Sequence, residues 1–262
     1  MWKVRQHPSS RVAYIVYADL LDMAASLLPL HCKVIFLTDR GFADTHLMTH
    51  LKRLDWHWCI RFKSSFWIYR GSHRPCKTSR LSLALGETRF WHHVYMTKVR
   101  YGPVHLALAR RKDGKEEWFV VSDEPTDLQT FAEYGLRFDI EENFLDDPSN
   151  GFQLESSLIR SATALERLCL VLALTTRYLV SQGTEVVKQG QRRWVDPHWF
   201  RGQSYLKIGW KWVERALSRG YKLVTRVYLA AEADPEPAMA SRRQAQKPPR
   251  PFSVLEFHDA VA

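Results

Sequence analysis

Apolar and polar residues follow two different periods along the first 55 residues. Residues 12–28 place apolar side chains three and four positions apart and stop at Pro29, which predicts a helix. The next apolar run, Lys33 to Thr38, is rich in β-branched residues and predicts a buried strand. Asp39 to Phe42 interrupts the pattern with turn-forming residues, and helical spacing resumes over residues 44–54. We therefore expect helix, strand, turn and helix in this order.

The period changes to two between residues 56 and 124. Several short stretches there are aromatic and β-branched and partly alternate with polar residues, as expected of half-buried strands. They cover residues 56–70, 89–99, 104–110 and 116–124. The pair Asp113-Gly114 separates the last two, and an Asp-Gly pair between strands is a strong hairpin signal. The segment is expected to be a mostly antiparallel β-rich insert.

Helical spacing returns after Pro125, with Thr126 as the expected N-cap, and continues through residues 134–147. A second helical stretch is expected over residues 154–179. Its apolar stripe consists of Leu158, Ala162, Leu165, Cys169 and Leu172. Both helices are expected to pack on the sheet.

The last predicted helix runs from Ser204 to Arg219 and ends at Gly220. Its expected apolar stripe is Leu206, Trp210, Val213 and Leu217. Basic residues recur every fourth position, which suits either a solvated outer face or a ridge that faces DNA. They are Lys207, Lys211, Arg215 and Arg219.

Residues 232–251 are rich in Pro, Ala, Arg, Gln and Lys, so the chain is expected to finish in a flexible tail. Four cations in this tail could contact phosphate without fixed geometry. They are Arg242, Arg243, Lys247 and Arg250.

Composition narrows the class of protein. The 262 residues are 45% hydrophobic and 25% charged, which suits a folded protein with a sizeable core. A net charge of +10 makes a polyanion the first partner to consider, although a merely basic protein would carry the same excess. The longest apolar run, Leu168 to Leu174, is far short of the roughly 20 residues of a membrane span. Four scattered cysteines exclude a disulfide scaffold and fit a reducing cytoplasm.

Two patterns carry candidate chemistry. Asp39 follows an apolar strand, and the carboxyl edge of an open α/β sheet is where ligands bind, although an Asp in this place also commonly forms a turn or caps a helix. Tyr134, Arg137 and Glu141 are three and four residues apart, so on a helix they share one face. A phenol, a guanidinium and a carboxylate suit a phosphodiester held beside Mg²⁺. The alternative is an ordinary surface ion pair between Arg137 and Glu141.

These motifs together resemble the DDE transposases of bacterial insertion sequences. The matching stretches are TDRGF at residues 38–42 and YGLRFDIEENFLDDPSNGFQLES at residues 134–156. More narrowly, the second stretch is similar to the signature helix with Tyr, Arg, Glu and Lys at fixed spacing. Members of that group have an RNase H-like core with a β-rich insert before the last catalytic Glu. The insert expected at residues 56–124 lies in the same place.

The resemblance implies a role for each matching residue. Asp39 corresponds to the second catalytic Asp and Glu141 to the final Glu, and both would bind Mg²⁺ or Mn²⁺. Tyr134 and Arg137 correspond to a pair that contacts DNA phosphate, and Arg40 is a further expected DNA contact. Double-stranded DNA is the implied partner, with no membrane, and a homodimer or an association with full-length transposase is expected. The implied location is the bacterial cytoplasm, at the nucleoid.

The resemblance also divides the chain into expected segments. These are a partial RNase H-like core (1–55), the β-rich insert (56–124), the helical remainder of the catalytic core (125–182), a C-terminal helical region (183–231) and the flexible tail (232–262). The fold class is thus α/β, with the core incomplete at the N-terminus.

Two departures from the family pattern affect the expected activity. Pro148 stands where the signature has Lys, which removes a phosphate contact and disfavours a helix there. The first catalytic Asp would lie upstream, and the early carboxylates, Asp19 and Asp22, fall within a predicted helix. The chain is therefore expected to be an N-terminally truncated and catalytically impaired copy. The alternatives are a non-catalytic DNA-binding or dimerising remnant and an RNase H-like nuclease unrelated to mobile elements.

Other polar residues are weaker candidates. His46, His57 and the pair His92-His93 lack partners at metal-ligand spacing, so a packed or surface role is expected for them. Arg61 and Lys63 share one polar face of a predicted strand, which suits either DNA or solvent.

Overall fold

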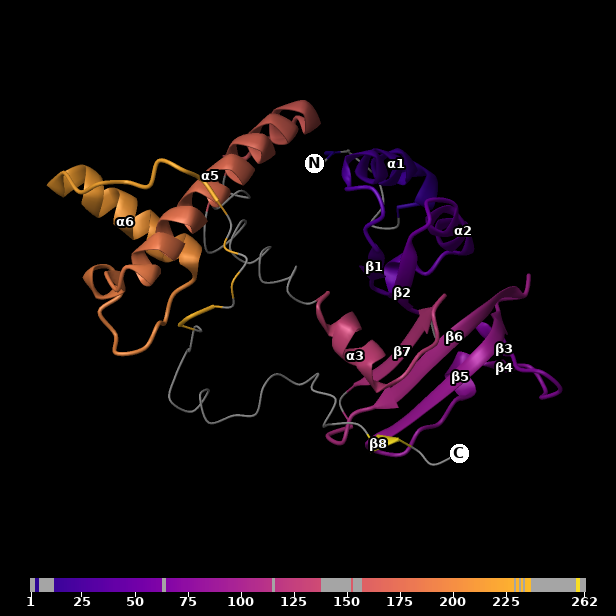
Figure 1. Ribbon diagram of the computed structural model, residues 1–262. Coiled ribbons are helices and arrows are strands. Elements are labelled where there is room, and N and C mark those ends of the chain that lie inside the picture. The colour runs from indigo at the N-terminus through magenta and orange to yellow at the C-terminus, as the bar shows by residue number, and fades with distance from the viewer. Residues whose placement is uncertain are drawn as a thin grey trace. The chain divides into compact units, whose positions relative to one another are not determined.

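The computed structural model describes residues 3–4, 12–62, 65–114, 116–137, 152, 157–228, 230, 232, 234–236 and 258–259. The chain forms two compact units, one built mainly from residues 7–144 and the other mainly from residues 145–248 (Figure 1). Each unit is described by itself. Among the described helices, none combines the length and apolar character that a bilayer span requires.

The first unit begins with a parallel strand pair. β1 (Ile35–Thr38) and β2 (His57–Arg61) are joined through α2 (Thr45–Arg53), and Thr38 pairs with Ile60 at their carboxyl ends. Parallel neighbours need a crossover connection, and a helix supplies it here. This confirms the predicted strand at residues 33–38 and the predicted helix at residues 44–54.

The remaining strands extend the same sheet, and apart from β8 they pair antiparallel, as predicted for the insert. The sheet order is β1-β2-β7-β6-β5-β3-β4, and β8 pairs with the start of β5. The bounds are β3 (Trp67–Tyr69), β4 (Cys76–Lys77), β5 (Glu87–Met96), β6 (Tyr101–Arg110), β7 (Glu117–Ser122) and β8 (His258–Asp259). Core strands and insert thus share one sheet.

The predicted Asp-Gly hairpin joins β6 to β7. Gly114 has φ +69°, a conformation that favours glycine, and its N–H donates to the carbonyl of Arg111. The N–H of Arg111 in turn donates to the carbonyl of Glu116, which closes the loop. The turn chemistry read from the sequence is confirmed.

The sheet is buried on both faces, and its side chains alternate between two cores. Trp58, Ile60, Leu106 and Val121 belong to one cluster. The residues next to them in the strands, such as Cys59, Ala107 and Val120, belong to the other. This period of two places neighbouring residues of each strand on opposite faces.

Helices cover each of these faces. α1 (Ala18–Leu27) and α2 contribute Leu21, Leu47 and Leu51 to the first cluster, and a 3₁₀ turn, η1 (Tyr14–Val16), precedes α1. The first helix therefore begins later than the predicted residue 12. α3 (Leu128–Gly135) contributes to the second cluster. Figure 1 shows α1 and α2 close to β1 and β2, and α3 close to β7.

The start of α3 corrects the predicted N-cap. Asp127, not Thr126, caps the helix, because its carboxylate accepts from the N–H of Thr130 at 3.1 Å in a capping box. The hydroxyl of Thr126 instead donates to the carbonyl of Leu106, at 2.9 Å, and so ties the loop to β6.

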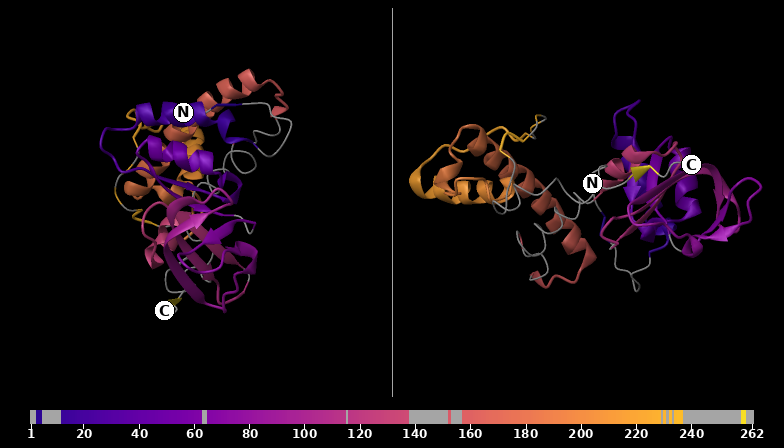
Figure 2. Two further views of the ribbon diagram at one scale, coloured as in Figure 1. Left: turned by 90° about the vertical axis from the view of Figure 1, so that its right-hand side faces the viewer. Right: turned by 90° about the horizontal axis from the view of Figure 1, so that it is seen from below.

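The second unit is a helical pair. α5 (Ala162–Lys188) and α6 (Tyr205–Arg219) lie side by side in the views of Figures 1 and 2, and a 3₁₀ turn, η6 (Arg192–Trp194), lies between them in sequence. α5 starts eight residues later than predicted and is continuous across residues 182 and 183. Leu158, predicted on its apolar stripe, is 83% exposed with φ 55° and precedes the helix.

Two glycines allow α5 and α6 to touch closely. A Cβ on Gly183 would lie 2.0 Å from the carbonyl oxygen of Tyr205, and one on Gly209 would lie 1.8 Å from that of Leu179. The predicted stripe of α6 is wrong at two positions, since Trp210 is 39% exposed and Leu217 is 74% exposed, whereas Val213 is half-buried. The buried residues are Leu206, Ile208, Gly209, Trp212 and Ala216. The bounds of α6 and its end at Gly220, with φ 71°, are as predicted.

Ion pairs fix the end of this unit. Arg201 pairs with Asp234, and Arg192 pairs with Glu236 at 2.7 Å. Lys188 pairs with Glu232 at 3.1 Å. The first residues after position 231 therefore contact α5 and the η6 region.

Candidate functional site

Asp39 lies at the carboxyl edge of the parallel strand pair. It follows Thr38 directly and caps η2 (Arg40–Phe42), with its Oδ1 accepting from the N–H of Gly41 at 2.8 Å. The turn and cap role considered for this residue is therefore present. In the described part of the chain, its Oδ2 accepts no hydrogen bond, so one hard oxygen remains available.

Gly41 shapes this turn. A Cβ at residue 41 would lie 2.9 Å from Asp39 Oδ1, closer than side-chain carbons normally approach an oxygen. The missing side chain therefore lets the carboxylate fold back onto the backbone of its own turn. Arg40, an expected DNA contact, is exposed beside it.

Tyr134 is buried rather than exposed. It is 0% exposed, and its ring packs edge-on against Trp118, with the centroids 5.3 Å apart. Burial raises the pKa of Tyr134 to about 12, and the nearby charges of Arg137 and Arg61 act in the opposite direction. Tyr134 and Arg137 were predicted to share one exposed surface, but the side chain of Tyr134 is instead packed into the core against the sheet.

Arg137 lies just beyond α3, in a turn. The helix ends at Gly135, earlier than predicted, and glycine is a poor helix former. The guanidinium carbon of Arg137 stands 5.9 Å from the centroid of the Tyr134 ring. Glu141 and Pro148 lie outside the described residues, so the spacing argument for Glu141 stays a prediction.

The structure brings the Tyr134 region and Asp39 to the same end of β2. Thr38 pairs with Ile60, so Asp39 and Arg61 both follow the last paired residues of β1 and β2. Tyr134 packs against Trp118, two residues before the Val120 that pairs with Arg61, so the end of α3 lies near this end of β2. Three of the predicted site residues, Asp39, Arg40 and Tyr134, therefore belong to elements that meet at the carboxyl edge.

Asp39 fits a divalent ion as a single ligand. Within the described residues, no group of three or more His, Cys, Asp or Glu side chains stands close enough to hold a metal ion. The other predicted ligand, Glu141, is not among these residues.

His92 and His105 lie with their Nδ1 atoms 3.0 Å apart, and burial, with His92 and His93 nearby, lowers the pKa of His105.

The opposite edge of the sheet holds a polar cluster that the sequence analysis missed. Asp123 accepts from the N–H of Trp58 at 2.8 Å and pairs with Nδ1 of His57 at 2.9 Å. Glu124 pairs with Lys33 at 2.7 Å beside a cavity of about 250 Å³. The sequence signal for this cluster is the acidic pair Asp123-Glu124, which follows β7 directly. Its contacts tie the amino end of β2 to β7, which is a structural role.

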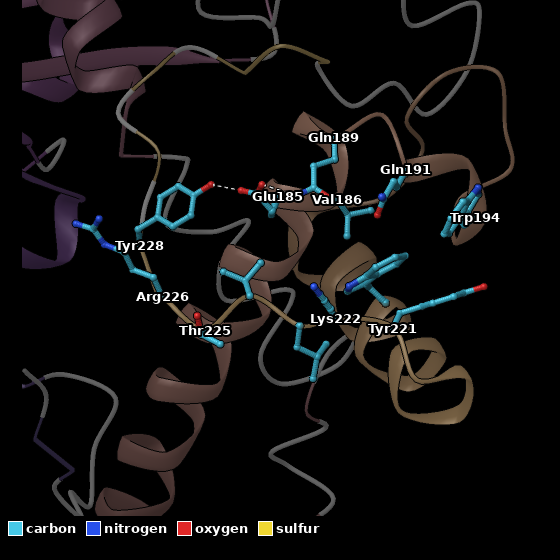
Figure 3. Close-up of a pocket in the computed structure, with 13 residues that line it drawn as sticks. Glu185, Val186, Gln189, Gln191, Trp194, Tyr221, Lys222, Thr225, Arg226 and Tyr228 are labelled. Atoms are coloured by element: carbon cyan, nitrogen blue, oxygen red, sulfur yellow. Dashed lines mark hydrogen bonds between the residues drawn. The ribbon is translucent and has the colours of Figure 1, made fainter.

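The second unit contains a larger cavity, of about 890 Å³ (Figure 3). Trp194, Trp212 and Tyr221 form one wall, with Trp212 and Tyr221 stacked 5.6 Å apart. At the other end Tyr228 donates to Glu185 at 2.7 Å, as the dashed line in Figure 3 shows. Hydrogen bonds from Tyr228 and Gln189 lower the pKa of Glu185. These contacts hold residues 221–228 against α5.

The fold and the candidate site define a class: a mixed α/β protein with helices on both faces of its sheet and an acidic residue at the carboxyl end of a strand. The model of one family, described as the transposase DDE domain, matches residues 16–176. The match covers more than half of the chain, and the chain belongs to this family. No curated protein and no solved structure matches it.

Proposed function

We propose that this protein acts in DNA transposition, cutting and joining phosphodiester bonds with the help of a divalent metal ion. The observation that carries the proposal is the carboxylate of Asp39, which stands at the end of β1 inside the family-matched region with one oxygen available. Carboxylates at such strand ends are well placed for ligands, because the backbone that supports them is rigid.

The proposed core is RNase H-like and includes β2, and the later strands within residues 56–124 are inserted before the segment that carries Glu141. In support, β1, α2 and β2 form a parallel unit, and α3 returns toward the carboxyl end of β2 after the antiparallel strands. The motif at residues 134–156 supports the narrower assignment to transposases of bacterial insertion sequences.

Asp39 and Glu141 are the proposed ligands of Mg²⁺ or Mn²⁺. When bound, the ion would supply the positive charge that phosphoryl transfer requires. The hydrogen bond from Gly41 fixes one oxygen of Asp39, so the other keeps a defined direction. Orientation of this kind reduces the cost of assembling a site.

Arg137 and Arg40 are the proposed phosphate contacts. A guanidinium grips phosphate oxygens through two parallel hydrogen bonds, and Arg40 is exposed beside Asp39. Because the phenol of Tyr134 is buried, its proposed role is to position Arg137, whose guanidinium stands over the Tyr134 ring. Double-stranded DNA is the proposed partner, and the formal charge of +10 favours it.

The test compares two aspartates that cap helices in the same way. Asp39→Asn removes the proposed ligand charge, whereas Asp44→Asn changes the N-cap of α2, whose carboxylate accepts from the N–H of His46 at 2.8 Å and is not a proposed ligand. We expect Asp39→Asn to lower Mg²⁺-dependent nicking of plasmid DNA by roughly 100-fold, the upper end of what perturbing a metal site costs. Asp44→Asn should keep the rate of the unmodified protein.

Each other result has a defined meaning. Equal rates for both variants would contradict the role of Asp39. DNA binding that resists Asp39→Asn, in a protein that does not nick DNA with Mg²⁺ or Mn²⁺, would favour the alternative: a non-catalytic DNA-binding protein. Nicking without joining of DNA ends would favour a nuclease.

A further inference from the structure

The positive charge of this protein is concentrated in one segment. Residues 56–112 contain 12 Lys and Arg and a single acidic residue, Glu87, for a formal charge of +11. The rest of the chain contains 26 Lys and Arg and 27 Asp and Glu. The charge excess of the whole chain therefore originates in residues 56–112.

Carboxylates neutralise one part of this segment. Arg61 lies 3.4 Å from Glu116, Arg111 lies 3.1 Å from Asp113, and Arg110 lies 3.8 Å from Glu117. Arg89 pairs with Glu87, the one acidic residue of the segment. Three of these pairs involve acidic residues at or next to the hairpin that joins β6 to β7.

Six other cations have no such partner in the described part of the chain. They lie in or just after the β3–β4 hairpin and in the turn between β5 and β6, and all except Arg70 are exposed. They are Arg70, Arg74, Lys77, Arg80, Lys98 and Arg100. We call these six residues the cationic end of the sheet.

Strand pairing gathers the cationic end in one place. Tyr69 pairs with Tyr95 near the end of β5, and the N–H of Thr97, in the β5–β6 turn, donates to the carbonyl of Trp67 at 2.8 Å. The β3–β4 hairpin and the β5–β6 turn are thus neighbours. Figure 1 shows both at the same end of the sheet, away from the β6–β7 hairpin.

Aromatic rings hold three of these cations. The guanidinium of Arg70 lies 3.7 Å from the centre of the Trp91 ring, and that of Arg100 lies 4.9 Å from the Tyr69 ring. Lys77 lies 5.6 Å from the Trp67 ring. Stacking restricts a guanidinium while its N–H groups, which point outward in its own plane, stay free to bind oxygen. Such groups are prepared to bind phosphate.

We propose that the cationic end of the sheet binds the phosphate backbone of double-stranded DNA. This inference rests on the proposed function and locates its DNA on a surface distinct from the carboxyl edge of β1 and β2. A surface that inserts into anionic lipid presents its aromatic rings to the bilayer, whereas here cations cover the rings. Backbone contacts of this kind position DNA and read no sequence.

Two triple variants of equal charge change test the proposal. One replaces Arg74, Lys77 and Arg80 with Gln, and the control replaces Lys207, Lys211 and Arg219 of α6, whose basic residues equally suit a solvated outer face, with Gln. Binding of a short random-sequence duplex is measured by fluorescence anisotropy in EDTA at several salt concentrations. We expect the first variant to lower the slope of log K against log salt by about 2 to 3, since each phosphate contact contributes about 0.9.

The control should keep the slope of the unmodified protein. An unchanged slope in the first variant, or an equal loss in the control, would overturn the proposal. Circular dichroism checks that both variants are folded. If the unmodified protein bound phosphatidylserine vesicles more tightly than DNA, and the first variant lost that binding, the surface would be a membrane-binding surface and the proposal would be overturned.

A second variant keeps every charge. Arg70→Lys combined with Arg100→Lys removes the planar groups that stack on Trp91 and Tyr69, so we expect the slope to persist while affinity falls about three- to tenfold. Unchanged affinity would overturn the role of the stacked groups.

Because EDTA removes the metal ion, these outcomes are independent of Asp39. Normal nicking with unaltered binding by the first variant would reject this surface while the proposed function stands.

Discussion

At the scale of single residues, the turn after β1 depends on a glycine. A methyl group at residue 41 would lie 2.9 Å from Asp39 Oδ1 and would push the carboxylate aside. We therefore predict that Gly41→Ala lowers Mg²⁺-dependent nicking about tenfold or more, as loss of a supporting contact around a metal does. Thermal unfolding should change little. Gly202→Ala is the control, because nothing lies within 4 Å of a Cβ there.

The buried phenol of Tyr134 predicts a dependence of stability on pH. Its pKa is raised from 10.0 to about 12, so the folded protein keeps a proton that the unfolded chain loses above pH 10. This stabilisation is complete below pH 10 and is lost as the pH rises toward 12. The free energy of unfolding should therefore decrease at alkaline pH, and we expect this decrease to be smaller by up to about 2 kcal/mol in the Tyr134→Phe variant.

Urea unfolding at pH 9 and pH 11 measures the effect. Tyr17 and Tyr205 have pKa values of about 12 as well, so the informative quantity is the difference between the unmodified protein and the Tyr134→Phe variant. Identical loss of stability in both would contradict the assignment to Tyr134.

The same residues show what local sequence can predict. Asp39 acts as the cap that its turn-forming neighbours indicate, because a cap depends on residues one or two positions away. The burial of Tyr134 in α3 depends on Trp118 in β7, and spacing along a helix does not reveal such a partner. The ligand role of Asp39 and the role of Glu141 remain predictions.

At the scale of elements, the crossing of α5 and α6 depends on Gly183 and Gly209. An added methyl group at residue 209 would lie 1.8 Å from a backbone oxygen of α5, which cannot move as a flexible side chain can. We predict that Gly209→Ala lowers the free energy of unfolding by about 1–3 kcal/mol or more. Gly220→Ala, where φ is 71° and nothing lies nearby, tests backbone strain alone. An equal effect of both substitutions would contradict close packing as the cause.

This crossing also explains an error in the sequence analysis. Periodicity fixes the bounds of α6, because its Ser204 cap and Gly220 end are local signals. Which face of α6 is buried depends on how closely α5 approaches it. The glycines allow a close approach, so the face of α6 that carries Gly209 and Ala216 is buried. Trp210 and Leu217 are apolar but lie outside this buried face and are exposed. Hydrophobicity alone does not distinguish these faces.

At the scale of the whole molecule, strand content was predictable but the joining of the insert to the core was not. The alternation of residues 104–110 and 116–124 indicates a hairpin, which β6 and β7 confirm. The pairing of β2 with β7, Cys59 with Ser122, joins residues far apart in sequence. No local pattern encodes such a pair, so the alternation predicts the strands of the insert but not their place in the sheet of the core.

The separation of paired and unpaired cations along the sheet has a consequence before any contact forms. A unit with its excess positive charge at one end has an electric dipole, and the field of a polyanion exerts a torque on it over about a Debye length. Approaching molecules would be turned so that the β3–β4 hairpin leads. Encounters would then begin in a restricted range of orientations, and added salt would shorten the distance over which this alignment acts.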